Sequence, residues 1–182
     1  MDGARRITGS GTIEGSVLVG CVASMVELIK WHAMHRLYCT QRVERPIEEV
    51  FAFFERPENL DSITPPELNF RILTPSPITM EKGTLIDYTV RITGIPLRWT
   101  TYIARYEPPH CFVDVQVRGP YSFWHHTHTF RAVSDHATLI EDEVLYLLPY
   151  GIVGRAVHAL WVRRQLERIF AYRARRYHEL LG

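Results

Sequence analysis

Residues 152–181 read IVGRAVHALWVRRQLERIFAYRARRYHELL, and nothing after Gly154 in this stretch breaks a helix. Its apolar residues recur at helical spacing, and the stripe expected to be buried consists of Val153, Val157, Leu160, Val162, Leu166, Ile169, Phe170, Tyr177 and Leu180. At about 1.5 Å per residue such a helix is about 45 Å long, which exceeds the width of a small domain. Since the preceding chain reads mostly as short strands, we expect one antiparallel sheet to wrap around this helix.

The opposite face of the predicted helix is basic. It carries Arg155, Arg163, Arg164, Arg168, Arg173, Arg175 and Arg176, with Glu167 and Glu179 as the acidic residues. The formal net charge of the whole chain is only +1, so the remainder of the chain is acidic. We interpret this face as a solvated helix exterior, and the alternative is a surface that docks a partner protein or an anionic membrane surface. We expect no nucleic-acid partner.

Length and composition describe an ordinary globular chain. Its 182 residues suffice for one domain with a sizeable core, and 46% of them are hydrophobic. No apolar run is long enough to span a bilayer, so we expect no stable membrane insertion. Cys21, Cys39 and Cys111 form an odd, scattered set without metal-ligand spacing, which favours a reducing cytoplasm.

Residues 1–34 differ from the rest of the chain. Residues 1–15 are rich in Gly, Ser and Thr, and residues 16–31 are apolar with Glu27 among them. We interpret residues 1–34 as an N-terminal extension outside the domain, with Met34 as an alternative start, and residues 35–182 as one domain. Two other interpretations are a signal peptide, whose residues 18–21 resemble a lipoprotein cleavage box, and a short helix over residues 17–31 docked on the domain.

The expected order of elements defines the fold class. A strand over residues 35–45 comes first, and Pro46 then suits the first position of a helix that has Glu48 and Glu49 in its first turn. A second short helix is expected over residues 58–63, followed by strands over residues 68–73, 83–93, 97–106, 111–118, 121–133 and 137–148. Short turns separate these strands, so sequential strands must be antiparallel neighbours. The fold class is therefore α+β, a curved antiparallel seven-stranded sheet around a long C-terminal helix, with two short helices after the first strand.

Several short motifs occur in the same order as in a known superfamily. They are RPIEEVFAFF (residues 45–54), PENL (57–60), ITPP (63–66), GIPLRW (94–99), EPP (107–109), GPY (119–121) and WHHTHTF (124–130). Over about residues 36–181 the chain resembles the START-like superfamily, also called SRPBCC. The resemblance is to its polyketide cyclase/dehydrase and lipid transport branch, in the bacterial single-domain, ligand-binding form. This implies a helix-grip fold that holds an apolar ligand between the sheet and the last helix, without a catalytic signature.

The strand over residues 121–133 is the richest in chemistry. One face of it carries Trp124, His126, His128 and Phe130, while the odd-numbered residues share the other face. We expect the even-numbered face to point inward, because the odd-numbered face meets Glu141 and Glu143 of the next strand and reads as a solvated surface. Three residues of the preceding strand count against this choice, since they would face outward unless the extension covers them: Val113, Val115 and Val117.

A two-residue hairpin register would place His126 near Asp114 and His128 near Asp142. In one interpretation each carboxylate accepts a hydrogen bond from a histidine ring and the network only satisfies itself. In a second, the histidines bind a polar head group while aromatic side chains hold an apolar body. In a third, the four residues act as general acids and bases, although no nucleophile neighbours them, or they bind a metal, for which a catalytic site needs three ligands and an open position.

The expected ligand site consists of Tyr88, Arg118, Trp124, His126, His128, Val144 and Tyr146. Our leading hypothesis is a cytoplasmic protein that binds a hydrophobic small molecule, lipid-like or polyketide-like, and is a binding protein rather than an enzyme. One alternative is a cyclase, dehydratase or hydrolase that uses the histidines with Asp114 and Asp142. Another is a protein- or membrane-interaction module that uses the basic C-terminal helix. We expect no cofactor and no metal, and the sequence assigns neither the ligand nor the oligomeric state.

Overall fold

Seven antiparallel strands form one sheet in the order β1-β7-β6-β5-β4-β3-β2. The structure is a computed structural model that describes residues 34–181. The strands are β1 (His35–Val43), β2 (Arg71–Ile72), β3 (Leu85–Ile92), β4 (Ile95–Glu107), β5 (Cys111–Arg118), β6 (Phe123–Ser134) and β7 (Ala137–Leu147). The chain from β3 to β7 runs as a meander, and β1 pairs with β7 at the far edge. The predicted seven-stranded antiparallel sheet is confirmed.

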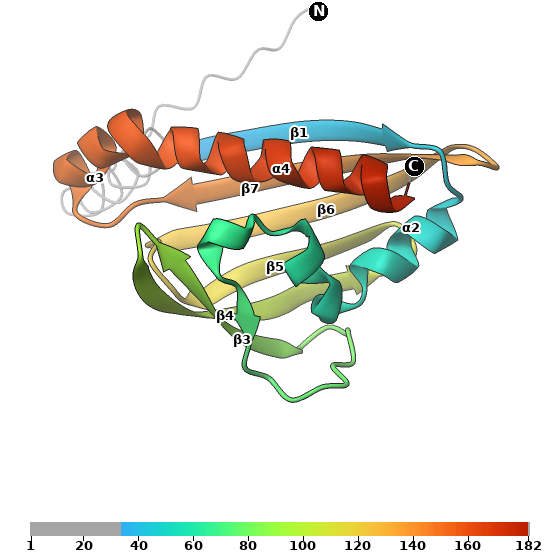
Figure 1. The fold of residues 1–182 in the computed structure, drawn as a ribbon, viewed down its shortest axis with the longest axis horizontal. Helices are drawn as coiled ribbons and strands as arrows, with labels where there is room; N and C mark the ends of the chain where they lie inside the picture. Colours follow the sequence, from blue (N-terminus) through green and yellow to red (C-terminus); the bar gives the residue numbers. More distant parts are fainter. Residues whose placement is uncertain (1–33, 182) are drawn as a thin grey trace, which may run out of the picture. The chain divides into compact units, whose positions relative to one another are not determined.

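Helices cover one face of this sheet. After β1 come α2 (Ile47–Phe54) and two 3₁₀ segments, η1 (Pro57–Ile63) and η2 (Pro66–Leu68). The C-terminal helix consists of α3 (Gly151–Val157), a π-helical turn η3 (His158–Val162) and α4 (Arg163–Leu181). In Figure 1, α4 lies along the sheet over β1 and β7, and α2 lies on the same side of the sheet. This arrangement is the helix-grip architecture expected from the sequence.

Local sequence explains the first helix. Pro46 precedes its first turn, and Glu48 and Glu49 lie in that turn, where the partial positive charge of the helix N-terminus favours carboxylates. The side chains that α2 buries are Ile47, Val50, Phe51 and Phe54, as the sequence predicted. The ring of Phe54 lies 5.1 Å from the ring of Tyr177 in α4, so α2 also anchors the end of the C-terminal helix.

All strands except β5 differ from the predicted bounds by one to three residues, and local turns explain the differences in β2 and β4. The strand expected over residues 68–73 shrinks to Arg71–Ile72, because residues 66–68 form a 3₁₀ turn and Asn69 takes a left-handed conformation with φ of 42°. The strand expected from residue 97 begins earlier, at Ile95. A tight turn with Thr93 and Gly94 both at positive φ, 51° and 82°, lets β4 pair with β3 directly from Ile95.

The predicted buried stripe of the C-terminal helix is wrong in its first third. Val153 and Leu160 are 64% and 73% exposed. The amide of Arg163 donates to the carbonyl of His158, the longer i to i+5 spacing of a π-turn. The extra residue in this turn shifts the face that follows, so the buried stripe begins at Val162. It then continues through Leu166, Phe170, Tyr177 and Leu181, which takes the place expected for Leu180.

The buried side chains form two clusters on the covered face of the sheet. One surrounds α2 and the end of α4, and includes Phe51, Phe130 and Ile140. The other joins Trp99 and Trp124 of the sheet to the start of α4. Cys39 of β1 packs against the second cluster, with its Cα paired to that of Asp142 in β7. Near it, the Gln41 side chain donates a hydrogen bond to the Ala174 carbonyl of α4, 2.6 Å away.

The predicted N-terminal extension, except Met34, lies outside the described residues, so its structure remains a prediction. From His35 onward the chain forms one compact unit. Among the described residues, no helix is both long enough and apolar enough to cross a membrane.

Candidate functional site

A cavity of about 170 Å³ lies between the sheet and the helices. Apolar and aromatic side chains make up most of its wall. The sheet contributes Ile86, Tyr88, Val90, Trp99, Ile103, Phe112 and Trp124, and the C-terminal helix contributes Trp161, Val162, Leu166, Ile169, Phe170 and Tyr177. Trp99 and Trp124 pack edge to face with their ring centres 5.3 Å apart, which stiffens this wall.

The even-numbered face of β6 points inward, as predicted. Burial alternates strictly along Trp124–Phe130, so Trp124, His126, His128 and Phe130 are buried while the residues between them are half-buried. The two histidine side chains are only 3% and 6% exposed. The valines of β5, which the sequence analysis counted against this orientation, differ in exposure. Val117 is 63% exposed, whereas Val113 is buried. Whether the extension covers these valines concerns residues outside the described part of the chain.

The predicted strand register is also confirmed. The Cα partner of His126 on β5 is Asp114, and the Cα partner of His128 on β7 is Asp142. The hydrogen bonds, however, run diagonally across this register. His126 Nε2 lies 2.9 Å from Asp142 Oδ1, and His128 Nε2 lies 3.0 Å from Asp114 Oδ2. Each ring is thus hydrogen-bonded to the carboxylate whose Cα is paired with the other histidine.

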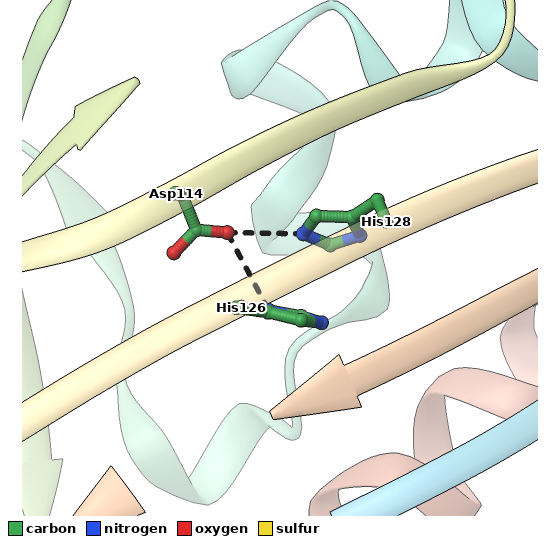
Figure 2. A group of neighbouring side chains, drawn as sticks. All are labelled: Asp114, His126 and His128. Atoms are coloured by element: carbon green, nitrogen blue, oxygen red, sulfur yellow. Dashed lines mark hydrogen bonds and ion pairs between the residues drawn. The ribbon is translucent and has the colours of Figure 1, made fainter. Parts of the chain in front are cut away.

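The remaining ring nitrogens approach the other carboxylate of each pair. His126 Nδ1 lies 3.4 Å from Asp114 Oδ2, and His128 Nδ1 lies 2.9 Å from Asp142 Oδ1. The second contact is short but lacks hydrogen-bond geometry. His128 Nδ1 is therefore buried without a hydrogen-bond partner. Figure 2 shows one oxygen of Asp114 pointing toward both rings. The two histidines therefore bridge two carboxylates, one at the cavity wall and one behind it.

Burial and the pairing with histidines have opposite effects on the pKa values of Asp114 and Asp142. Burial of Asp142 disfavours its charged form, but its hydrogen bond with His126, its close contact with His128 and the charges of both rings outweigh that effect and lower its pKa strongly. The pKa of Asp114 is lowered as well, since the charges of the two histidines and the hydrogen bond of His128 outweigh burial. Both carboxylates are therefore ionised at neutral pH.

The pKa values of the two histidines shift in opposite directions in the folded protein. Burial lowers the pKa of His126, the neighbouring His128 lowers it further, and the two carboxylates offset this only in part. Burial acts on His128 too, but its hydrogen bond with Asp114, its close contact with Asp142 and the charges of both carboxylates outweigh burial and raise its pKa. In this cluster His128 is the ring that holds a proton more readily, and His126 is the ring that remains neutral.

Four of the predicted ligand-site residues line the cavity, namely Tyr88, Trp124, His126 and His128. Val144 and Tyr146 are buried on the same face but do not line the cavity, since Val144 is 0% exposed and the Tyr146 hydroxyl pairs with His158 of η3. Arg118 is exposed and does not line the cavity, since it lies at the end of β5 beside a register shift and the turn to β6. Its predicted role as a neutraliser of an acidic ligand thus has no support from its position.

Arg173 is a cavity residue that the sequence pattern placed on the wrong face. It lines the cavity, with its guanidinium 5.2 Å from the centre of the Phe170 ring, and its Nε is buried without a hydrogen-bond partner. Its position, three residues after Phe170 and four before Tyr177, matched the buried stripe and could have revealed this orientation. Trp99 Nε1 and the Tyr177 hydroxyl, on residues that also line the cavity, likewise lack partners.

The structure contains a second histidine pair, His35 and His158, which the sequence analysis did not predict. The ring of His35, at the start of β1, stacks on the ring of His158 in η3 with their centres 3.4 Å apart. His158 Nε2 lies 2.9 Å from the Tyr146 hydroxyl. Burial lowers the pKa of both histidines, and the charges of His35 and Arg163 lower that of His158 further. The residues lie more than a hundred positions apart, so no spacing rule could have joined them.

Solved structures with this architecture are numerous, although sequence similarity to them is low. A START superfamily protein from Mycobacterium smegmatis matches with a TM-score of 0.60 and 15% identity, covering 78% of this chain and 96% of that one. The Zhui aromatase/cyclase from Streptomyces sp. R1128 matches with a TM-score of 0.58 and 14% identity, covering 79% and 93%. A major latex-like protein from Panax ginseng matches with a TM-score of 0.61 and 10% identity, covering 82% and 99%.

No family model matches the chain, and no curated protein matches its sequence. At these identities the structural matches establish the fold and nothing further. The chain has the START-like, helix-grip fold.

Proposed function

We propose that this protein binds a hydrophobic small molecule, lipid-like or polyketide-like, in the cavity between the sheet and α4. The single observation that carries the proposal is an apolar cavity of about 170 Å³ inside the domain. An apolar guest favours this site because it removes the apolar surface of the wall, and its own, from water, at about 25 cal/mol per Å². A filled interior would instead have favoured the interaction-module alternative.

The wall of the cavity also suggests that the guest has a polar end. Arg173, Tyr177 and Trp99 each line the cavity and each have a buried donor without a partner among the described residues. A buried donor that stays unpaired costs about 1–3 kcal/mol. A guest with an acceptor oxygen, such as a carboxylate or a ketone, would pair with one of these donors, for example Arg173, while its apolar body contacts Trp124 and Phe170.

The fold comparisons support a ligand of this class without defining it. A matching structure is an aromatase/cyclase, which motivates the polyketide-like choice. Burying about 300 Å² of apolar surface contributes about 7 kcal/mol before association costs are subtracted, so we expect micromolar or weaker affinity. Cys39 and Cys111 are free thiols, which is consistent with the cytoplasmic location that we also propose.

A cavity-filling variant tests the proposal. Leu166→Trp fills the cavity from α4, so we expect it to weaken binding of a fluorescent fatty-acid probe at least about tenfold. Leu160→Trp is the matched control, because Leu160 lies on the same helix but is exposed. Denaturant melts of both variants separate lost affinity from lost stability, since overpacking costs about 1–3 kcal/mol. Equal binding by Leu166→Trp and the wild type, or no apolar molecule bound to the wild type, would refute the proposal.

A further inference from the structure

Asp114, His126 and His128 have a second property, which concerns metal ions. Each offers one ligand atom, and these atoms all lie within 4.8 Å of one another. Oδ2 of Asp114 lies 3.4 Å from His126 Nδ1 and 3.0 Å from His128 Nε2. A tetrahedral ion with bonds of about 2.0–2.1 Å holds its ligands about 3.3 Å apart. Two of the three ligand separations therefore already match a metal site.

We propose that Asp114 Oδ2, His126 Nδ1 and His128 Nε2 together bind a divalent transition-metal ion, with Zn²⁺ as the first choice. Two imidazole nitrogens and one carboxylate oxygen suit Zn²⁺ and also Fe²⁺, Co²⁺ and Ni²⁺. Spacing along the chain did not predict this site, because two histidines at positions i and i+2 supply only two ligands. The third ligand comes from β5, and Figure 2 shows its carboxylate facing both rings.

The far side of each histidine is arranged as a metal site requires. A ligating histidine usually donates its other ring N–H to a carboxylate, which fixes the tautomer and orients the ring. Asp142 provides that carboxylate for His126, whose Nε2 lies 2.9 Å from its Oδ1. His128 Nδ1 lies 2.9 Å from the same oxygen, so a slight rotation of the ring would give it the same partner. Phe112 stacks on the His128 ring at 4.1 Å and holds its plane.

The charges of the cluster favour a cation. Asp142 is buried and Asp114 is largely shielded from solvent, with its side chain 16% exposed, and a divalent ion between neutral histidines balances their two negative charges. Metal binding would replace the proton that now lies between His128 Nε2 and Asp114 Oδ2. Two cations among the described residues line the cavity, Arg56 and Arg173, and Arg173 is the one whose charge acts on Asp114 and so opposes the ion.

The site would also be open on one side. Asp114, His126 and His128 line the cavity, whereas Asp142 does not. The fourth coordination position of a bound ion would therefore face the cavity, as in zinc sites with three protein ligands and an exchangeable fourth. A water molecule or an oxygen atom of the guest would occupy that position. The proposal itself does not depend on whether the cavity binds a guest.

Equilibrium dialysis of the full-length, chelator-treated protein against Zn²⁺ and Co²⁺ tests the metal site. We expect about one ion per chain in the wild type and, with Co²⁺, visible absorption typical of a four-coordinate site. Asp114→Asn keeps the shape of the side chain and removes its charge, so it should weaken binding at least about tenfold. Asp142→Asn should weaken it by about 10–100-fold without removing a ligand.

The matched control is His125→Ala, on the same strand and the opposite face, which should retain the wild-type affinity. Ions bound elsewhere on the chain persist in all variants, so only the difference between the variants reports on this site. Thermal melts with and without Zn²⁺ give a second readout, because an ion bound only by the folded state raises the melting temperature. A wild type that binds no more Zn²⁺ than Asp114→Asn would overturn the proposal, and would mean that the four residues only satisfy one another. Undiminished binding by Asp142→Asn, with binding lost in Asp114→Asn, would keep the three ligands and refute only the part of Asp142 in orienting the histidines.

Discussion

At the scale of single residues, the buried histidine–aspartate cluster has a clear energetic signature. Asp142 is 5% exposed and lies within 2.9 Å of a nitrogen of each histidine. Asp142→Ala should destabilise the protein by about 3–5 kcal/mol, because it leaves buried partners unpaired. Glu143→Ala is the control on the same strand, since its ion pair with Arg36 is exposed and is worth at most about 1 kcal/mol. Urea denaturation of both variants measures the difference, and similar losses would contradict the proposed pairing.

The stacked pair His35 and His158 predicts a pH effect. The pKa of each is lowered in the folded protein, by burial first, so the unfolded chain takes up protons more readily. Stability is therefore undiminished above the unfolded pKa of about 6.5 and falls as the pH drops from about 7 to about 5. His158→Gln should reduce that fall, because it removes one of the two groups. His126 and His128 titrate in both proteins, so they cancel in the comparison.

Denaturant melts of the wild type and His158→Gln at several pH values measure this effect. His136→Gln is the control, because His136 is exposed in the turn before β7. An identical slope of unfolding free energy against pH in wild type and His158→Gln would mean that the stacked pair does not titrate differently on folding.

At the scale of elements, the corrected face of the C-terminal helix can be tested with two leucines. Leu166 is buried and Leu160 is 73% exposed, although periodicity placed both in one stripe. Leu166→Ala should cost about 2–5 kcal/mol, and Leu160→Ala should stay within about 0.5 kcal/mol of the wild type. Chemical denaturation compares the two. Equal losses would show that α3 and α4 bury a continuous stripe after all.

The element scale also shows what the sequence could predict. Glu141 and Glu143, which meet the odd-numbered face of β6, predicted which face points inward. The expected hairpin also placed His128 near Asp142, although its turn consists of Asp135 and His136 and the register shifts between Ala132 and Ser134. Sequence could not give the diagonal hydrogen bonds, because they depend on how each ring rotates about its side-chain bonds. Nor could it give the π-turn at His158–Val162, since one extra residue per turn leaves no periodic trace in so short a segment. Arg173 was misplaced because charge was taken as a sign of exposure.

At the scale of the whole chain, many weak local signals agreed, which is why the fold was predictable while the ligand was not. Turn residues, strand lengths and the C-terminal periodicity all favoured one architecture. The ligand depends instead on the shape and donors of the cavity, which residues distant in sequence create together. Acid–base catalysis by the histidines and docking through the basic helix therefore stay predictions beside the binding of an apolar guest.

Removal of the extension tests the predicted domain boundary. A chain starting at Met34 should fold with nearly the same melting temperature, because the sheet and both core clusters lie within His35–Leu181. Circular dichroism melts of the full and shortened chains measure this. A loss of more than about 2 kcal/mol, a large fraction of a typical stability, would mean that residues 17–31 belong to the core.

The position of Cys39 makes the reactivity of its thiol a measure of how often α4 moves away from the sheet. Its thiol packs against the core cluster to which α4 contributes, and burial, together with the charge of Asp142, raises its pKa to about 11. At neutral pH almost none of this half-buried thiol is thiolate, so an alkylating reagent reacts slowly while α4 lies on the sheet and faster when α4 moves away and the pKa falls. In a chain with Cys21 and Cys111 replaced by serine, the labelling rate of Cys39 therefore reports how often α4 separates from the sheet. A bound guest that contacts both α4 and the sheet would make such movements rarer, so it should slow the labelling of Cys39.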